Sequence, residues 1–515
     1  MSTPGIYLST TIPYINGRPH LGHALEFVQA DVLARHYRQA GNQVRLQSGT
    51  DDNSLKNVLA AAAEGTGVAD LVSRNSAAFE ALSGSLQLSF DDFIRTSSDP
   101  RHRPGVERFW RACADRGDLY RKSYQGLYCT GCEQFYRPAE LDGGRCPEHG
   151  TEPEPVAEEN WFFRLSRYAG RLRDEISSGR LRIEPAARRH EVLAFIDGGL
   201  EDFSASRPAS RAGGWGIPVP GDPDQVIYVW WDALGNYITS LGYGDGPGAQ
   251  DFHRWWAGPG QRIHLAGKGV LRFHAVYWPA MLLSAGLPLP TAIYVHDYLT
   301  IGGAKISKSA TGPAARAADP AALAAAYGPD AVRWWLLREV PRAGDADFTP
   351  ERLTARANED LANGLGNLVS RVTSMVHRYR DGVVPAAAAA PASGAAAELT
   401  GACAALPGQV AASLARPDFR AATAALAALT GQANRCIEET APWRLARAEA
   451  AGDEAAGQEL QTVLAVLVAA CQTLAAELAP FLPGLAARVS AACSAGQEGR
   501  LPAPEPLYPR LEGPR

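Results

Sequence analysis

The stretch that decides the fold is Ile6-Tyr7-Leu8-Ser9-Thr10, a strand-like run that leads through a turn containing Gly17 into His20-Leu21-Gly22-His23, where a helix is expected to begin. A strand, a glycine-containing turn and a helix start place backbone N–H groups where a polyphosphate can bind at the positive end of the helix dipole. The two histidines can face one phosphate, and Gly22 leaves room for a nucleotide against the backbone. This pattern predicts a nucleotide site. The alternative is an ordinary βα turn with two exposed histidines.

The strand-and-helix rhythm continues outward from this site. An apolar stripe of Leu25, Val28 and Val32 follows on the expected helix, and Val44-Arg45-Leu46-Gln47 is again strand-like. Such alternation is typical of βαβ units and predicts a mostly parallel sheet, an α/β fold of the Rossmann type. From Pro350 onward strand signals vanish and Ala and Leu dominate. We expect one half of an α/β domain over 1–114, an insertion over 115–160, the second half over 161–349 and an all-helical domain over 350–515.

Length and composition limit the class of protein. With 515 residues the chain exceeds the size at which one hydrophobic core keeps growing, so several domains are expected. A hydrophobic fraction of 46% and a charged fraction of 20%, without a long apolar run, predict a globular protein with no membrane span. Residues 1–12 lack a secretory signal pattern, which favours a reducing cytoplasm. A net charge of −5 excludes nucleic-acid binding through bulk positive charge, but not through an Arg-rich face.

The insertion carries clustered cysteines. Cys129-Thr130-Gly131-Cys132 is followed by Cys146-Pro147-Glu148-His149, two ligand pairs at knuckle spacing with glycines between them. This spacing predicts a closed, tetrahedral, structural Zn²⁺ site made of Cys129, Cys132, Cys146 and His149. The alternative is a set of unrelated reduced cysteines. The remaining five cysteines are scattered through apolar sequence and are expected to be small core residues.

A second motif lies far downstream. Gly303-Ala304-Lys305-Ile306-Ser307-Lys308-Ser309 is a short loop with two lysines and two hydroxyls. Taken alone, such a loop is a solvated basic turn. Paired with the histidine motif it is more specific, because displacing pyrophosphate from ATP needs mobile positive charge on the β and γ phosphates.

Together these motifs resemble the HIGH and KMSKS signatures of class I aminoacyl-tRNA synthetases, and residues 5 to about 450 resemble the methionyl-tRNA synthetase family. The resemblance implies a Rossmann-type class I catalytic domain with a zinc-binding insertion, followed by an all-α anticodon-binding domain. It also implies activation of methionine by ATP with Mg²⁺, and transfer to tRNA with a CAU anticodon. The chain ends soon after the helical domain without an appended tRNA-binding module, so a monomer is expected.

The resemblance assigns catalytic roles residue by residue. His20 and His23 stabilise the α-phosphate, while Lys308 grips the leaving pyrophosphate. Lys305 and Arg207 assist the activation step. The ATP site implied in this way comprises Thr11, His20, Gly22, His23, Gly267, Lys305 and Lys308.

The amino acid pocket also follows from the resemblance. A thioether needs apolar and aromatic walls with a few polar anchors, and Asp51 would hold the ammonium group. From the residues alone, most of these aromatics are expected to be core side chains. The implied pocket residues are Ile12, Tyr14, Asp51, Trp230, Ala233, Tyr237, Val270 and His274.

Two departures from the family pattern stand beside these matches. Where the family has Gly-Thr-Asp-Glu-His-Gly, this chain has Gly49-Thr50-Asp51-Asp52-Asn53-Ser54, and where Gly-Lys-Asp is expected it has Gly267-Lys268-Gly269. Loss of one hydrogen bond to a charged group costs about 1.5–3 kcal/mol if nothing replaces it. These departures motivate one alternative, a paralogue that activates a methionine analogue or donates the acyl group to a small metabolite. A second alternative is a catalytically weak tRNA-binding protein, which would not need the histidine and lysine motifs.

The helical region carries three residues that resemble those with which the family reads the anticodon. Asn367 and Arg371 are four residues apart, on one helix face, and Trp443 follows Pro442, where it could stack on an unpaired base. Taken alone, the Asn/Arg pair is a solvated helix face and Trp443 a core residue.

Overall fold

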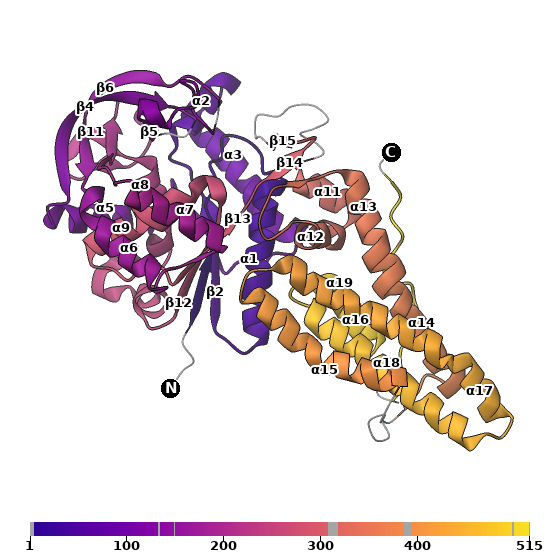
Figure 1. The fold of residues 1–515 in the computed structure, drawn as a ribbon. Helices are drawn as coiled ribbons and strands as arrows, with labels where there is room; N and C mark the ends of the chain where they lie inside the picture. The colour runs from indigo at the N-terminus through magenta and orange to yellow at the C-terminus, as the bar shows by residue number, and fades with distance from the viewer. Residues whose placement is uncertain are drawn as a thin grey trace. The chain divides into compact units, whose positions relative to one another are not determined.

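The computed structural model describes residues 5–131, 134–148, 150–306, 318–385, 394–496 and 499–513. These residues form two compact units (Figure 1). The described residues of Met1–Gly84, Leu88–Tyr298 and Ile306–Ala315 make up the first, called the sheet unit here. The described residues of Ser85–Gln87, Leu299–Lys305 and Arg316–Arg515 make up the second, the helical unit.

A six-stranded sheet forms the centre of the sheet unit. Its strand order is β3-β2-β1-β12-β13-β7, and every neighbouring pair is parallel. Ile6 pairs with both Val44 and Gln261, so the chain order reverses on either side of β1. Ligands bind at such a switch point, outside the carboxyl ends of the strands. The strands are β1 (Ile6–Ser9), β2 (Val44–Thr50), β3 (Asp92–Arg95), β7 (Arg182–Glu184), β12 (Gln261–Gly267) and β13 (Ala292–His296).

Helices complete the α/β layers of this unit. Helix α1 packs against β1, β2 and β12, and its expected stripe of Leu25, Val28 and Val32 is fully buried (Figure 1). The parallel sheet and its helices therefore confirm the Rossmann-type α/β fold. The α-helices of the unit are α1 (Leu21–Gln39), α2 (Leu55–Glu64), α3 (Val68–Glu80), α4 (Leu82–Ser85), α5 (His102–Asp115), α6 (Ala169–Ser177), α7 (Ala186–Asp197), α8 (Val229–Thr239) and α9 (Trp278–Ala285).

Antiparallel sheets form in the expected insertion and also beyond it. The sheet of order β5-β4-β6-β8 begins within 115–160 and ends outside it, while the sheet of order β10-β11-β9 lies wholly within 206–227, where strand and helix alternation was expected instead. The long pair β4·β6 runs from Leu119 opposite Phe163 to Tyr128 opposite Glu154. These strands are β4 (Leu119–Cys129), β5 (Gln134–Tyr136), β6 (Glu154–Phe163), β8 (Phe203–Ser204), β9 (Ser206–Pro208), β10 (Pro218–Val219) and β11 (Asp222–Ile227).

The helical unit consists of packed helices and one small sheet with the order β15-β14-β16. Helices α15, α16 and α18 pack on one another. The predicted helical character of the C-terminal region is therefore confirmed. The unit contains β14 (Leu299–Ile301), β15 (Ala304–Lys305), β16 (Ala346–Asp347), α11 (Pro320–Tyr327), α12 (Pro329–Arg338), α13 (Pro350–Arg356), the π-helical η7 (Ala357–Gly366), α14 (Asn367–Arg380), α15 (Gly394–Leu414), α16 (Phe419–Thr440), α17 (Pro442–Ala450), α18 (Glu454–Leu478) and α19 (Pro483–Ala492).

Arg333 on α12 joins distant parts of the helical unit. Its side chain is fully buried and donates hydrogen bonds to the carbonyl oxygens of Leu86 at 3.0 Å, Pro480 at 3.1 Å and Phe481 at 2.7 Å. Buried arginines are tolerated where such acceptors satisfy their donors.

Helix α18 has the length and apolar composition to cross a membrane, and it is the only helix of the described residues that does. Of its most apolar window, 56% is buried inside the unit, where Leu460, Leu464 and Leu467 pack in the core. This is the pattern of a bundle-core helix, so the helix is weak evidence for a membrane span.

Candidate active site

The histidine motif caps helix α1. The Nδ1 atom of His20 accepts from the backbone N–H of Gly22, and the Nδ1 atom of His23 accepts from the N–H of His20, each at 3.1 Å. The two rings stack with centroids 3.8 Å apart. Because both Nδ1 atoms accept, each neutral ring carries its proton on Nε2, a donor suited to a phosphate oxygen. A Cβ atom at Gly22 would lie 3.0 Å from the His20 ring, so a side chain there would push that ring aside.

Glu26 ties three elements together at the switch point. Its Oε1 atom accepts from the N–H and the hydroxyl of Thr11, both at 2.6 Å, and its Oε2 atom lies 2.9 Å from Nε2 of His296 at the end of β13. Thr11 is one of the predicted ATP-binding residues, whereas the sequence reasoning missed Glu26 and His296. The one sequence signal that could have indicated these two residues is their position. His296 ends a parallel strand, and Glu26 lies one turn into α1.

Contacts at both ring nitrogens favour the charged form of His296. Its Nδ1 atom donates to the carbonyl oxygen of Asp297 at 2.9 Å, while Nε2 faces Glu26. Burial alone would lower the pKa of His296, but the hydrogen bond and the charge of Glu26 outweigh burial and the pKa is raised. The switch point therefore holds a buried histidine–carboxylate pair.

Asp51 lies beside Tyr14 at the carboxyl edge of the sheet. The two residues form a parallel bridge, the N–H of Asp51 donates to the carbonyl oxygen of Pro13 at 3.0 Å, and the Asp51 side chain is buried. Lys56 places its Nζ atom 4.4 Å from the centroid of the Tyr14 ring. The predicted ammonium anchor and one predicted aromatic wall are thus neighbours.

The other predicted pocket residues form a connected aromatic layer. Trp230 lies edge-on to Tyr14, with centroids 6.0 Å apart, and the Tyr237 hydroxyl lies 2.7 Å from Nε2 of His274. The carbonyl oxygen of Val270 accepts from Nδ1 of His274 at 2.9 Å, so the Tyr237 hydroxyl is the donor to Nε2. Ala233 is buried on α8 between Trp230 and Tyr237, and Ile12 is half-buried in the loop after β1.

His264 supports this layer from β12 and was not predicted. The indole N–H of Trp278 donates to Nε2 of His264 at 3.2 Å, and Nδ1 lies 2.6 Å from Oγ of Ser9. Since Trp can only donate, His264 is neutral, with its proton on Nδ1. Burial lowers the pKa of His264 well below its usual value and lowers that of His274, while burial raises the pKa of Tyr237. The layer is therefore uncharged.

The residues of the first departure from the family pattern, Asp52, Asn53 and Ser54, make hydrogen bonds that support the fold. Asn53 donates to Asp232 Oδ2 at 2.7 Å, and the other oxygen of Asp232 is hydrogen-bonded to the buried His102. Ser54 caps α2, since its hydroxyl accepts from the N–H of Lys56 at 3.1 Å. Asp52 accepts from the Ser97 hydroxyl at 2.7 Å, and burial raises its pKa. The altered residues thus hold α2 and α8 in place.

The second departure is filled by a tyrosine. A Cβ atom at Gly269 would lie 2.0 Å from the hydroxyl oxygen of Tyr298. That hydroxyl donates to Glu148 Oε2 at 3.4 Å, and the Nζ atom of Lys268 lies 4.6 Å from the centroid of the Tyr298 ring. The space expected for a carboxylate therefore holds the Tyr298 side chain. Gly267, a predicted ATP-binding residue, lies beside it at the end of β12.

Arg207 lies against the insertion. Its guanidinium donates to the Ser204 carbonyl and hydroxyl oxygens at 3.0 and 2.8 Å and to the Ser206 carbonyl oxygen at 2.7 Å. It lies over the rings of Tyr228, at 4.3 Å, and Phe135, at 5.1 Å. Among the described residues, no hydrogen bond or ring contact joins Arg207 to the histidine motif.

The zinc and lysine motifs are described in part. Cys129 and Cys146 are buried in one small cluster with Tyr136, whose hydroxyl lies 3.6 Å from Sγ of Cys146. Cys132 and His149 lie outside the described residues. Within the described residues no group of three or more ligands that could hold a metal ion is found. Of the two lysines in the lysine motif, only the backbone of Lys305, in β15, is described, and Lys308 lies outside the described residues.

The predicted anticodon residues lie on two helices of the helical unit, α14 and α17. Asn367 is exposed at the start of α14, and Arg371, one turn later, donates to Oδ1 of Asn434 on α16 at 3.2 Å. Trp443, at the start of α17, is 38% exposed, which is unusual for a large apolar side chain. It is therefore not a core residue.

Comparisons with known proteins agree with this architecture. The family model for class I tRNA synthetases (M) matches residues 6–155 and 136–373, which is more than half of the chain. The chain therefore belongs to the class I tRNA synthetase family, M type, and is a ligase of that class.

The individual proteins to which the chain is similar are methionine–tRNA ligases. Methionine–tRNA ligase of Brucella melitensis is 38% identical over 99% of this chain and 98% of its own length, and that of Thermosynechococcus vestitus is 40% identical over 94% and 89%. Mycobacterium tuberculosis methionyl-tRNA synthetase in complex with methionyl-adenylate superposes with a TM-score of 0.91, at 36% identity, covering 99% of this chain and 100% of the other.

Proposed function

We propose that this protein is a methionine–tRNA ligase, which activates methionine with ATP and transfers it to tRNA bearing a CAU anticodon. The observation that carries the proposal is a juxtaposition at one sheet edge. The His20–His23 pair caps α1, and the layer of Tyr14, Trp230 and Tyr237 lies at the carboxyl ends of the same strands. The names of the relatives favour this function over a paralogue that uses a methionine analogue or a small acceptor.

The first step joins methionine to AMP. A carboxylate oxygen of methionine attacks the α-phosphorus of ATP, and the bond from that phosphorus to the bridging oxygen breaks, releasing pyrophosphate. The Nε2–H groups of His20 and His23 donate to the α-phosphate oxygens, where charge develops in the transition state. Lys305 and Lys308, with Mg²⁺, neutralise the departing pyrophosphate. Asp51 holds the methionine ammonium group, and Thr11, Gly22 and Gly267 complete the ATP site.

The second step moves the methionyl group to tRNA. A ribose hydroxyl at the 3′ end of the tRNA attacks the carbonyl carbon of the adenylate, and the bond from that carbon to the phosphate oxygen breaks, so AMP leaves. Arg207, which lies over the rings of Phe135 and Tyr228, keeps the role that the resemblance implies, assistance of the first step.

The insertion is proposed to hold a structural Zn²⁺ through Cys129, Cys132, Cys146 and His149. Two of these ligands are described, and both thiols are buried in the same small cluster, as a closed tetrahedral site requires. A metal bound there would link β4 to the loop that precedes β6 and so rigidify the insertion.

The remaining expectations belong to the same proposal. The catalytic domain would comprise 1–114 and 161–349, with the zinc insertion at 115–160 and an anticodon-binding domain at 350–515. Asn367, Arg371 and Trp443 would read the anticodon, which the exposure of Trp443 supports. A monomer in the cytoplasm, with no membrane contact, completes the proposal.

Two assays test this function together. ATP–pyrophosphate exchange with a panel of amino acids should be strongest with methionine, and the protein should charge tRNA with a CAU anticodon. Lys308→Ala should slow exchange by about 10²-fold or more while methionine binding stays nearly unchanged, because the lysine acts on charge that develops in the transition state. Exchange with a different amino acid, or exchange without charging of any tRNA, would contradict the proposal.

A further inference from the structure

The segment Asp51-Asp52-Asn53-Ser54 connects β2 to α2 and belongs to neither element. We call it the anchor segment, because it carries Asp51, the proposed anchor of the methionine ammonium group. Strands and helices supply partners for their own backbone groups, whereas an irregular segment needs partners from other parts of the chain. The position of Asp51 therefore depends on the side chains that surround the anchor segment.

Asn57, on the first turn of α2, reaches back to the anchor segment. Its side chain is fully buried, and its Nδ2 atom donates to the carbonyl oxygens of Asp51 at 3.1 Å and Asp52 at 2.9 Å. Carbonyl oxygens only accept, so the amide nitrogen of Asn57, and not its oxygen, has to face them. Asn57 thus uses its N–H groups on two consecutive peptide groups of the anchor segment.

The other end of the Asn57 amide shows that an amide at this position is unfavourable for packing alone. Its Oδ1 atom is buried and has no hydrogen-bond partner among the described residues. A buried acceptor without a partner is destabilising, and apolar side chains are the usual occupants of a buried helix face. An apolar residue would avoid this penalty, but it would leave the two carbonyl groups without these donors. The amide is therefore suited to holding the anchor segment.

Further contacts hold the backbone on both sides of this point. The N–H of Asp51 donates to the carbonyl oxygen of Pro13 at 3.0 Å. The indole N–H of Trp215 donates to the carbonyl oxygen of Asp52 at 2.8 Å, so this oxygen accepts from both Trp215 and Asn57. Both polar groups of the Asp51 backbone are therefore held, the carbonyl group by Asn57.

The anchor segment is also joined to the aromatic layer of the proposed methionine pocket. Asn53 donates to Oδ2 of Asp232 on α8 at 2.7 Å. The same helix carries Trp230, Ala233 and Tyr237. The spacing between the ammonium anchor and the pocket for the methionine side chain is therefore set before the substrate binds. Such preorganisation reduces the free energy that binding has to supply for ordering the site.

We propose that Asn57 is a positioning residue for amino acid recognition, which holds the anchor segment so that the Asp51 carboxylate meets the ammonium group of the substrate. Asn57 itself does not touch the substrate. The inference deepens the proposed function and rests on the role of Asp51 in it. Loss of Asn57 should weaken recognition of the ammonium group selectively, because a displaced carboxylate loses its charge-assisted hydrogen bond while the rest of the substrate binds to other elements.

Two analogues of methionine separate these contributions. L-methioninol keeps the ammonium group and has a hydroxymethyl group in place of the carboxylate, whereas methylthiobutanoate, the deamino form of methionine, keeps the carboxylate and lacks the ammonium group. Their inhibition constants are measured in ATP–pyrophosphate exchange, beside kcat and KM for methionine and KM for ATP. Asn57→Leu removes the donors at similar size, and Asn57→Ala removes them with a smaller side chain, so that one misfolded variant does not end the test. Asp51→Asn is the reference variant.

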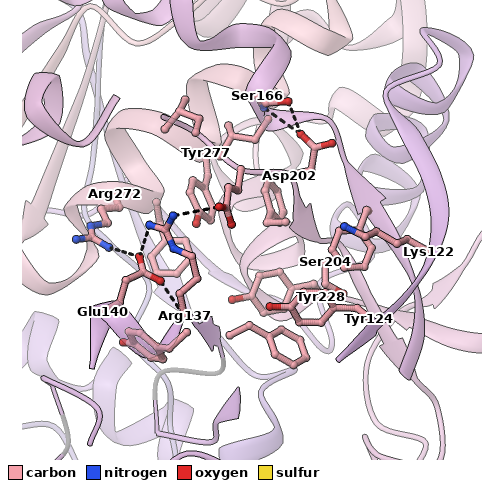
Figure 2. A pocket seen from close by; sticks show the side chains of 18 of the residues that line it. Lys122, Tyr124, Arg137, Glu140, Ser166, Asp202, Ser204, Tyr228, Arg272 and Tyr277 are labelled. Carbon is pink, nitrogen blue, oxygen red and sulfur yellow. Dashed lines mark hydrogen bonds and ion pairs between the residues drawn. The ribbon is translucent and has the colours of Figure 1, made fainter. Parts of the chain in front are cut away.

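Two control variants account for general effects on the fold. Ala61→Gly, at the buried position one turn after Asn57, weakens α2 and leaves the amide in place. Ser166→Ala removes the hydrogen bond of 2.7 Å from the Ser166 hydroxyl to Asp202, which Figure 2 shows in a cavity of the same unit. Within the described residues, no hydrogen bond or ring contact joins Ser166 to the anchor segment. Both control variants should bind the two analogues as the wild type does.

Asn57→Leu and Asn57→Ala should each raise the inhibition constant of L-methioninol and the KM for methionine about 10-fold. The inhibition constant of methylthiobutanoate and the KM for ATP should change less than about 2-fold. Equal weakening of both analogues, or unchanged binding of L-methioninol, would overturn the inference.

The reference variant distinguishes this failure from a failure of the proposed function. If Asp51→Asn weakens the binding of L-methioninol and the Asn57 variants do not, only the inference fails. If Asp51→Asn leaves L-methioninol binding unchanged, or if the wild type shows no exchange with methionine, the proposed site or function fails instead.

Discussion

At the scale of single residues, Gly269 and Tyr298 form a matched pair. A side chain at 269 would start 2.0 Å from the Tyr298 hydroxyl oxygen, so the tyrosine can occupy this place only because residue 269 is a glycine. With the hydroxyl removed, the nearest ring atom would still be 3.2 Å away, a tight but tolerable distance. The carboxylate expected from the family pattern and this tyrosine rotamer therefore exclude each other.

Gly269→Asp should lower the free energy of unfolding by about 1–3 kcal/mol, the usual cost of forcing a packed side chain aside. Tyr298→Phe should be much milder, and the double variant should recover most of the loss. Urea unfolding of the four proteins in a double-mutant cycle measures this coupling. Strictly additive effects would mean that Tyr298 moves away without cost.

His264 gives the protein a pH dependence of defined sign. Its folded-state pKa lies well below the value of 6.5 expected for the unfolded chain, because burial disfavours the charged ring. The stabilising contribution is therefore complete above about pH 6.5 and is lost as the pH falls below it, since the unfolded chain binds the proton first. His296, with a raised pKa, contributes in the opposite direction.

Replacing His264 with glutamine, which does not titrate, should flatten this part of the profile. The free energy of unfolding of the wild type should fall between pH 7.5 and 5.5 by about 1 kcal/mol more than that of His264→Gln, given about 1.4 kcal/mol per pH unit for one proton. Denaturant unfolding at the two pH values measures the difference. Parallel losses in both proteins would show that His264 does not carry this dependence.

At the scale of elements, the insertion tests the zinc proposal. Purified protein should contain about one zinc, and Cys146→Ser should lose it, because three ligands do not close a tetrahedral structural site. Protease cleavage between β4 and β6 should then accelerate. Cys403→Ser, a half-buried cysteine of the helical unit, should keep the metal. Metal analysis that finds no zinc in carefully prepared wild-type protein would contradict the proposal.

Elements formed by local sequence were the most predictable. The stripe of Leu25, Val28 and Val32 identified helix α1, and the run from Ile6 identified β1, because periodicity depends on neighbouring residues. The pairing of β4 with β6 was not predicted, since a Gly- and Pro-rich segment has no strong period and antiparallel register is set by contacts across the ribbon.

Side chains that meet across the fold were the least predictable. Glu26 and His296 are 270 residues apart, and nothing in the sequence near either residue indicates the other. The pocket aromatics were found only through family resemblance, because burial alone makes a ligand wall and a core residue look alike. For Trp443 the sequence alone favoured a core residue, whereas the side chain is exposed. This exposure could not be inferred from an apolar helical sequence.

At the scale of the whole molecule, the two units should carry separable parts of the reaction. Trp443→Ala should weaken the use of tRNA with a CAU anticodon about 5- to 150-fold, which corresponds to the loss of 1–3 kcal/mol of base stacking. Pyrophosphate exchange should barely change, because it needs no tRNA. Kinetics of charging and exchange on the same preparation measure both effects.

Trp443→Phe serves as the matched control for this prediction. It keeps an aromatic face and should retain most of the charging activity. If Trp443→Ala lowers exchange and charging equally, the residue supports the fold instead of the anticodon, despite its 38% exposure.

The three carbonyl acceptors of Arg333 have a consequence for the order in which the protein is made. Leu86 leaves the ribosome first, Arg333 follows, and Pro480 and Phe481 emerge only near the end of synthesis. A guanidinium is not deprotonated in proteins, so burying it without acceptors would be costly. The Arg333 side chain is therefore expected to stay hydrated until Pro480 and Phe481 have been synthesised. The central sheet, by contrast, has all its strands once His296 has emerged. Translation therefore completes the strands of the central sheet before the last acceptors of Arg333 exist. A ribosome that stalls between these two points would leave apolar surface of the helical unit exposed to aggregation.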